Sequence, residues 1–196
     1  MRRIILASSD FQKSKDLRKN IIALLQKPVH ESSAVIITTA SVEWKESNKH
    51  AALARQILEE IGFKDVAFLD IEFEDRNELK KYDVIYINGG NPFYLLYHLK
   101  KSTADEVIIK LANQGAVLVG ISAGAVVLGP NINIVDYLER GLNIVGLKDL
   151  SGLHLDDQVI YPHYTKEIED KIKLFEKKFK VEVKRLSDEQ SIIIKE

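Results

Sequence analysis

Short apolar runs alternate with amphipathic segments along most of the chain. Runs rich in β-branched residues predict strands buried on both faces. Segments with apolar residues three or four positions apart predict helices. The expected strands are Ile4–Ala7, Ala34–Thr39, Val66–Leu69, Asp83–Ile87, Ala116–Gly120, Val159–Tyr161, Val181–Lys184 and Ser191–Ile194. The expected helices are Lys13–Gln26, Asn48–Ile61, Phe93–Asn113 (with a break near Ser102-Thr103) and Lys166–Lys180.

This alternation predicts an α/β fold with three layers, in which helices cover both faces of a mostly parallel sheet. The 196 residues fit one domain, and no repeat or linker divides them, so residues 1–196 are expected to form a single domain. Ligands of such sheets bind beyond the carboxyl ends of the strands. We therefore look for chemistry at Asn88–Asn91, Gly120–Ser122 and Pro162-His163.

Composition narrows the function classes. With 28 Lys and Arg against 29 Asp and Glu, the net charge of −1 gives no reason to expect nucleic acid or an anionic membrane as a partner. The absence of cysteine excludes a disulfide framework, a thiolate metal site and a cysteine nucleophile. No apolar stretch approaches the roughly 20 residues of a membrane span. The apolar run after Arg3 ends at Ser8, before it could form a signal-peptide core. We expect a cytoplasmic protein without cofactor or metal, and the sequence leaves its oligomeric state open.

The segment from Gly120 to Gly124 matches the pattern G-x-S-x-G, with a buried strand before it and a helix-like segment after it. A sharp turn in that context exposes the serine hydroxyl, and the flanking glycines allow backbone segments to approach closely. Ser122 is therefore a candidate nucleophile. Free N–H groups at the helix start, that of Ala123 first, would stabilise an oxyanion. A tight turn or a phosphate-binding loop would give the same pattern.

A second glycine turn, Asn88-Gly89-Gly90-Asn91, follows the strand Asp83–Ile87. Successive glycines permit positive φ, and a free N–H of this turn is a candidate second oxyanion donor beside that of Ala123. The turn is also typical of a plain strand-to-helix connection, with Asn91 capping a helix that has Pro92 at its first position.

A serine nucleophile needs a base, and the base needs an orienting acid. His163 is favoured as the base because it follows an apolar strand and Pro162, and His154 is the alternative. His50 and His98 lie in predicted helices, where a surface or packing role is expected. Chain order leaves the acid open among Asp136, Asp156, Asp157, Asp188 and Glu189.

Three motifs in this order resemble the peptidase E family of serine peptidases, which includes aspartyl dipeptidases and, more distantly, cyanophycinases. They are Ile87–Asn91, Gly120–Ala125 and Tyr161–Tyr164, and the match extends from about Asp83 to the C-terminus. The resemblance implies a class I glutamine amidotransferase-like or flavodoxin-like sheet and a Ser-His-Glu triad. The family's Glu-Gly-Ser-like stretch corresponds to Glu189-Gln190-Ser191, so the triad would be Ser122, His163 and Glu189, with Gln190 departing from glycine.

The resemblance also implies an oxyanion hole formed by the N–H groups of Gly90 and Ala123, with Asn91, Asn133 and Asp136 as substrate-binding candidates. Asp136 is the alternative acid. The family's aspartyl dipeptidases use an arginine after the nucleophile helix, where Asn133 aligns best here. A neutral amide does not replace a guanidinium, so strict aspartyl specificity is not expected.

The leading hypothesis is a peptidase or amidase that cleaves short peptides through an acyl-enzyme. An esterase of the α/β-hydrolase type would place the acid before the histidine and promote Asp136 or Asp157. A non-catalytic binding protein on the same fold, with Ser122 as a turn residue, is the third hypothesis.

Overall fold

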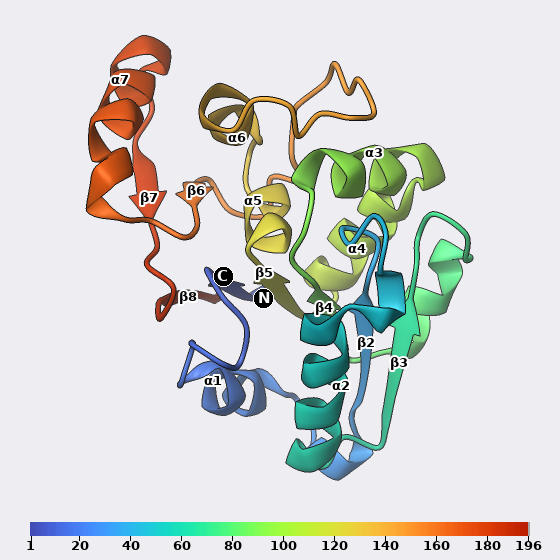
Figure 1. The fold of residues 1–196 in the computed structure, drawn as a ribbon. Coiled ribbons are helices and arrows are strands. Elements are labelled where there is room, and N and C mark those ends of the chain that lie inside the picture. The colour runs from blue at the N-terminus through green and yellow to red at the C-terminus, as the bar shows by residue number, and fades with distance from the viewer. Residues whose placement is uncertain (196) are drawn as a thin grey trace.

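A six-stranded sheet forms the centre of the computed structural model, which describes residues 1–195 (Figure 1). Within those residues, the strand order is β3-β2-β4-β5-β1-β8. Five strands run parallel, and β8 pairs antiparallel with β1 at one edge. The strands are β1 Arg3–Ala7, β2 Ser33–Ile37, β3 Asp65–Leu69, β4 Val84–Ile87, β5 Val117–Ile121 and β8 Ser191–Lys195.

Successive residues of the parallel strands point into two different apolar cores. Ile4 and Leu6 of β1 belong to one core, whereas Ile5 and Ala7 belong to the other. Both sets are fully buried, so the strands have no polar face, which explains the continuous β-branched runs in the sequence. The three-layer α/β prediction is confirmed.

Helices cover each face of the sheet. Helices α1 and α2 pack on one core, and α3, α4 and α5 pack on the other. Their bounds are α1 Leu17–Leu24, α2 Lys49–Ile61, α3 Pro92–Ser102, α4 Ala104–Asn113, α5 Ala123–Leu128, α6 Asn133–Leu138 and α7 Glu169–Phe179. Short 3-10 helices occur at Val29–Glu31, Lys45–Ser47, Arg76–Lys81 and Lys166–Ile168. In the part of the chain that the structure describes, no helix is long and apolar enough to cross a membrane.

The expected break near Ser102-Thr103 is present, and Thr103 adopts the left-handed conformation with φ 58°. Helix α1 begins four residues later than the pattern predicts, because the segment before it folds into turns that place polar residues at the sheet edge. Helix α6, which the sequence pattern did not predict, is one short segment within a long connection.

Strands β6 (Val159–Tyr161) and β7 (Val183–Arg185) form a separate two-stranded parallel sheet, connected by α7. Figure 1 shows this unit to one side of the main sheet. Arg185 joins it to α7 by charge-assisted hydrogen bonds to Glu169 and Glu176. The chain then returns through β8 to the main sheet.

We predict that Thr103→Gly stabilises the protein. A left-handed non-glycine residue costs roughly 1–2 kcal/mol, and the greater freedom of glycine in the unfolded chain offsets about half of the gain. The net increase of about 0.5–1 kcal/mol should raise Tm by about 2 °C in calorimetry for a chain of this size. Thr103→Ala retains Cβ and serves as the control. A Tm for Thr103→Gly at or below that of Thr103→Ala would contradict the prediction.

Candidate active site

Ser122 lies in a strained turn between β5 and α5. Its backbone has φ 49° and ψ −108°, an unusual conformation for a residue with a side chain. The strand ends at Ile121, and the helix begins at Ala123, so Ser122 makes the reversal alone. Its N–H donates to the carbonyl of Ala7 (2.9 Å), which fixes the turn against the end of β1. The expected strand-turn-helix context of the G-x-S-x-G motif is therefore present.

The two glycines of the motif are required by close backbone contacts. A Cβ at Gly124 would lie 2.4 Å from the carbonyl oxygen of Ile87, and one at Gly120 would lie 2.8 Å from the backbone of Gly124 and Ala125. Real Cβ atoms do not approach backbone atoms so closely. Without side chains at these positions, α5 can pack directly on the ends of β4 and β5.

His163 reaches Ser122 from the loop that follows β6. Its Nε2 lies 2.8 Å from Ser122 Oγ, a hydrogen-bond distance that suits proton transfer. The His163 backbone has φ 54°, and its N–H donates to Ser8 Oγ (2.7 Å). Pro162 and the end of the strand were the signals for this residue, and the structure brings it to Ser122. It does so from the small second sheet and not from the main one.

The carboxylate of Asp188 contacts the second nitrogen of the His163 imidazole. Its Oδ1 lies 2.6 Å from His163 Nδ1 and also accepts a hydrogen bond from Ser9 Oγ (3.0 Å). Lys13 Nζ donates to the other carboxylate oxygen. The hydrogen bond from Lys13, with those from His163 and Ser9, lowers the pKa of Asp188 far below its ordinary value. The carboxylate therefore stays ionised and can stabilise a protonated imidazole.

Chain order left Asp188 and Glu189 both open, and the family resemblance implied Glu189; in the structure the carboxylate at this nitrogen is that of Asp188. The two residues are the central pair of a turn closed by a hydrogen bond from the Gln190 N–H to the Ser187 carbonyl (2.9 Å). Neighbouring side chains of such a turn diverge: Asp188 points to the imidazole, whereas Glu189 is exposed. The carboxylate that contacts His163 therefore lies one residue before the Glu189 that the resemblance implied.

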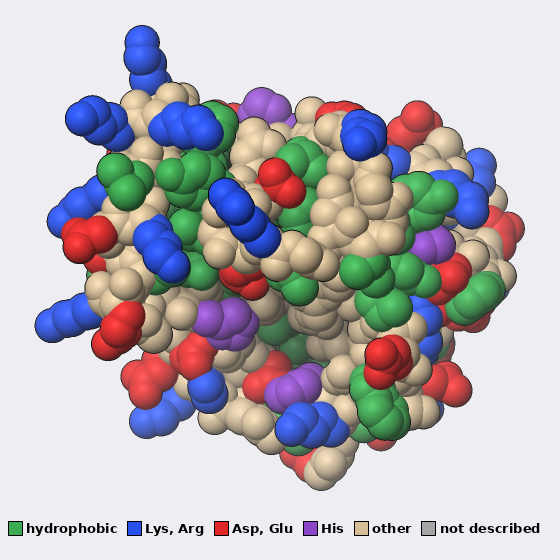
Figure 2. All heavy atoms as spheres, turned by 45° about the horizontal axis from the view of Figure 1, so that its top comes forward, with side chains coloured by type: hydrophobic (Ala, Val, Ile, Leu, Met, Phe, Trp, Pro, Cys, Tyr) green, Lys and Arg blue, Asp and Glu red, His purple; other side chains and the backbone are tan. Residues whose placement is uncertain are grey.

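A cavity of about 290 Å³ opens beside Ser122 at the carboxyl edge of the sheet. It is lined by Ser8, Ser9, Asp10, Gln12, Lys13, Asn48, His50, Asn88, Gly89, Gly90, Ile121, Ser122 and His163. Figure 2 looks onto this side of the molecule, where acidic and histidine side chains lie beside a hollow. Within residues 1–195, no group of three or more His, Asp or Glu side chains is arranged to hold a metal ion.

The glycine turn after β4 lies against the nucleophile. A Cβ at Gly89 would lie 3.3 Å from Ser122 Cβ, so the backbone of this turn is one wall of the cavity. Gly90 has φ 145°, and a side chain there would collide with the carbonyl of Ala40 at 2.2 Å. On the other side of Ser122, Ala123 is the first residue of α5, and first-turn N–H groups have no acceptor within their helix.

The three expected substrate-binding residues are not among those that line the cavity. Asn91 caps α3: its Oδ1 accepts from the N–H groups of Phe93 and Tyr94, and its Nδ2 donates to the Leu142 carbonyl. The capping interpretation of Asn91 is thus confirmed. Asn133 is the first residue of α6, and Asp136 is exposed on the same helix.

The loop from Ser8 to Lys13 supplies residues that the sequence reasoning missed. Ser8 holds the backbone of His163, and both Ser9 and Lys13 hold Asp188. A signal was present, because this polar loop directly follows a buried strand and so lies at the sheet edge where ligands bind. His50 was assigned a surface or packing role, but it lines the cavity.

Comparison with known proteins gives one consistent result. The model of peptidase family S51 matches residues 4–196. An uncharacterized peptidase of Listeria monocytogenes is 34% identical over 168 residues, 82% of this chain and 80% of its own length. An uncharacterized peptidase of Pasteurella multocida is 29% identical over 84% of this chain and 78% of its own length.

Solved structures agree with this result. The crystal structure of a candidate peptidase E protein from Listeria monocytogenes EGD-e superposes with a TM-score of 0.80 and 28% identity, covering 99% of this chain and 94% of the other. A peptidase from an acI-B1 Actinobacterium shares the fold, with a TM-score of 0.71 and 21% identity over 100% of this chain and 84% of the other.

We predict that Asp188→Asn slows the reaction of Ser122 with a fluorophosphonate probe far more than Glu189→Gln does. Loss of the orienting acid costs about 10⁴ in rate in comparable triads, because an amide does not fix the required tautomer. Glu189→Gln should stay within about threefold of the parent rate, as an exposed side chain usually does.

The two variants are matched, because each changes one carboxylate of the same turn into its amide. Labelling rates should be measured together with Tm, so that loss of folding is separated from loss of reactivity. If Glu189→Gln were labelled far more slowly than the parent protein while Asp188→Asn were labelled at the parent rate, Glu189 would be the acid.

Proposed function

Because this chain belongs to peptidase family S51, we propose that it hydrolyses an amide bond of short peptides with a Ser122-His163-Asp188 triad. Membership of this peptidase family makes the chain a hydrolase, and its serine type is consistent with the family. One observation carries the proposal further: Ser122 Oγ and Asp188 Oδ1 lie at the two opposite nitrogens of His163, at 2.8 and 2.6 Å. That arrangement is the one by which an imidazole activates a hydroxyl.

In the first half-reaction, Ser122 Oγ attacks the carbonyl carbon while His163 Nε2 takes the hydroxyl proton. Asp188 accepts the hydrogen bond from Nδ1–H and stabilises the positive charge that forms on the ring. The tetrahedral intermediate collapses when His163 gives the proton to the leaving amine. The C–N bond breaks, and the acyl group stays on Ser122 as an ester.

In the second half-reaction, His163 removes a proton from water, and the hydroxide attacks the acyl ester. Return of the proton to Ser122 Oγ releases the carboxylic acid and restores the enzyme. Both intermediates carry negative charge on the former carbonyl oxygen. We assign its stabilisation to the backbone N–H groups of Gly90 and Ala123, which lie in the two turns that flank the nucleophile.

Chain order supports a peptidase over an α/β-hydrolase-type esterase. That class places the acid before the histidine, whereas the acid at His163 follows it at Asp188. Asp157 pairs instead with His154 at 2.8 Å, on an exposed loop. A binding protein that uses Ser122 as a turn residue would need neither the hydrogen bond to His163 nor the second one to Asp188.

The size of the cavity limits the substrate. A volume of about 290 Å³ is at the lower end for small-molecule sites, so it suits one or two amino acid residues better than a folded protein. We therefore propose short peptides, with the residue that supplies the acyl group inside the cavity.

We predict that Ser122→Ala abolishes hydrolysis and leaves folding intact. Alanine has the same Cβ and no nucleophilic oxygen, so the expected loss is on the order of 10⁴–10⁶ in kcat. A screen of dipeptides and aminoacyl amides measures the activity, and covalent labelling by a fluorophosphonate probe measures reactivity. Ser47→Ala, at an exposed position, is the matched control. Activity of Ser122→Ala within tenfold of the parent would exclude Ser122 as the nucleophile.

We also predict no preference for aspartyl substrates. Among the residues that line the cavity in the described chain, Lys13 is the only Lys or Arg, and its ammonium binds Asp188. A substrate carboxylate would lose its water without gaining a free cation. The kcat/KM for Asp-Leu should be about tenfold or more below that for Ala-Leu and no higher than that for Asn-Leu, since each factor of ten corresponds to about 1.4 kcal/mol.

A clear preference for Asp-Leu would overturn this prediction. It would mean that a basic residue outside the cavity lining, such as Arg140 after α6, reaches the substrate. Asn133→Arg is the companion variant, because Asn133 aligns best with the arginine of the family's aspartyl dipeptidases. Since Asn133 does not line the cavity, the variant should leave the ratio of Asp-Leu to Asn-Leu unchanged.

A further inference from the structure

We infer that Asp10, His50 and Asn88 form a subsite beside the nucleophile that binds a positively charged nitrogen of the substrate. The inference rests on the proposed peptidase function and adds that the substrate carries a cationic nitrogen next to the scissile bond. All three residues line the cavity that Ser122 and His163 share. They come from three different elements: the loop after β1, the first turn of α2 and the end of β4.

Asn88 is a buried polar side chain without a partner. It is 1% exposed, and neither its Oδ1 nor its Nδ2 has a hydrogen-bond partner within the described residues. Leaving such a group unpaired costs about 1–3 kcal/mol, so buried amides are normally satisfied. Since Asn88 lines the cavity, a substrate group is the natural partner. Its neighbour Gly89 lies directly against Ser122, so that group would lie close to the scissile bond.

Asp10 places a carboxylate at the same cavity. Its side chain is 7% exposed and is held by two hydrogen bonds, from the N–H of Gln12 to Oδ1 (3.0 Å) and from His50 Nδ1 to Oδ2 (2.7 Å). Neither hydrogen bond involves Ser122, His163 or Asp188. Each carboxylate oxygen has more than one lone pair, so Asp10 can still accept from a ligand.

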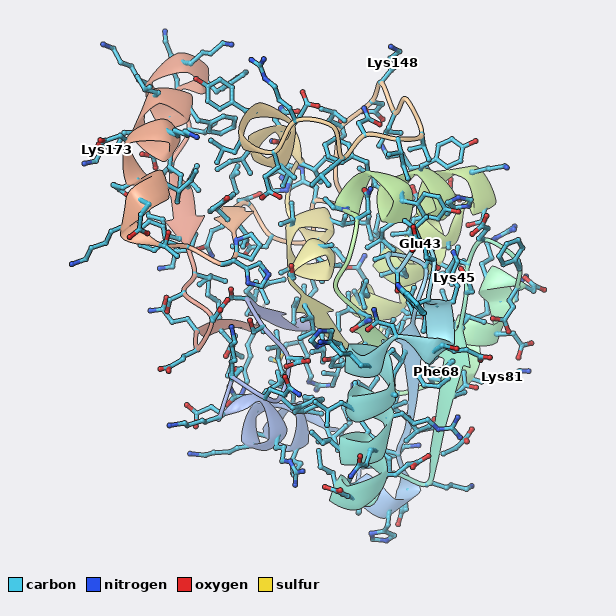
Figure 3. All side chains as sticks on the ribbon, viewed as in Figure 1. Glu43, Lys45, Phe68, Lys81, Lys148 and Lys173 are labelled. Atoms are coloured by element: carbon cyan, nitrogen blue, oxygen red, sulfur yellow. The ribbon has the colours of Figure 1, made fainter. Side chains whose placement is uncertain are left out.

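Contacts of the neighbouring residues hold His50 in place. The loop between β2 and α2 is anchored by Lys45, labelled in Figure 3, whose Nζ contacts Asp70 (3.1 Å) and Glu72 (2.6 Å). Asn48 then caps α2 through hydrogen bonds from the N–H groups of His50 and Ala51. His50 is therefore fixed at the start of the helix, where its ring reaches Asp10.

The charge around this subsite favours a cation. Asp188 is balanced by Lys13, which donates to it directly, whereas the hydrogen-bond partners of Asp10 are a backbone N–H and an imidazole. An ammonium group has three donors and no acceptor. Asp10 offers it a charged acceptor at the cavity, and Asn88, whose amide is closed to solvent, offers a neutral one once its side chain turns toward the ligand. Charge-assisted hydrogen bonds of this kind are about twice as strong as neutral ones.

Two groups of a peptide carry this chemistry next to the scissile carbonyl: a free α-amino group and the side chain of a basic residue. Both belong to the residue that supplies the acyl group. Separate pairs of substrates distinguish them. Ala-Leu is compared with N-acetyl-Ala-Leu for the α-amino group, and N-acetyl-Lys-Leu with N-acetyl-norleucyl-Leu for the side chain.

We expect kcat/KM to be at least about tenfold higher for the cationic member of one pair, and Asp10→Asn to reduce that ratio to about threefold or less. Asn88→Ala should reduce the same ratio. Asp16→Asn, which removes an exposed carboxylate at the start of α1, is the matched control and should leave the ratio unchanged. Ratios near one for both pairs in the parent protein, or an unchanged ratio in Asp10→Asn, would overturn the inference while leaving the peptidase function intact.

A binding measurement tests the subsite independently of catalysis. Calorimetric titration of Ser122→Ala with alaninamide and lysinamide, and with their N-acetylated forms, needs no turnover. We expect at least tenfold weaker binding when the responsible amine is acetylated, and a comparable loss in the Ser122→Ala, Asp10→Asn double variant. Equal affinity for amines and their acetylated forms, or no binding of any of these compounds, would overturn the inference. Cation binding without any hydrolysis would instead overturn the proposed function.

Discussion

The strained backbone of Ser122, with its positive φ, is the constraint from which the rest of the site follows. A residue with a side chain at φ 49° and ψ −108° costs on the order of 1–3 kcal/mol and persists only when its surroundings enforce it. Here the N–H of Ser122 is bound to the end of β1, and Gly124 packs against the carbonyl of Ile87 at the end of β4. The turn is therefore held by both strands that flank β5 in the sheet, and Ser122 lines the cavity with its hydroxyl at hydrogen-bond distance from His163.

Sheet topology explains how distant residues meet at that hydroxyl. Strand β1 lies between β5 and β8, so its following loop is adjacent to the end of one and the start of the other. Because β8 is antiparallel, it starts at the edge where the parallel strands end, with Ser191 opposite Ala7. Asp188, three residues earlier, thus lies at the carboxyl edge. Ser8 and Ser9 bridge the remaining gap by binding His163 and Asp188, respectively.

Most of the fold and half of the site could be predicted because both depend on local patterns. Buried strands appear as apolar runs, and the Ser122 turn appears as glycines that the close contacts with Ile87 and Ala125 require. The acid could not be fixed by pattern, because Asp188 and Glu189 are neighbours with the same chemistry and only the turn decides which one faces His163. The separate β6–β7 sheet was also hidden, since its strands look like those of the main sheet. The role of His50 could not be predicted for the same reason. Nothing in the sequence around a histidine in the first turn of a helix indicates that its side chain lines a cavity.

Lys13 interacts with two carboxylates at this edge of the sheet, those of Asp188 and Asp10. Its ammonium binds Asp188, and this hydrogen bond is the main reason why the pKa of Lys13 is raised and that of Asp188 is lowered. Asp10 contributes a weaker electrostatic effect on the same lysine. Since a cation committed to one carboxylate cannot also neutralise a second at full strength, the negative charge of Asp10 is left for a ligand. One loop between β1 and α1 therefore supplies both the support of Asp188, the proposed orienting acid, and Asp10, the carboxylate proposed to select the substrate. For this reason we expect changes in that loop to alter reactivity and specificity together, whereas changes in α6 should alter neither.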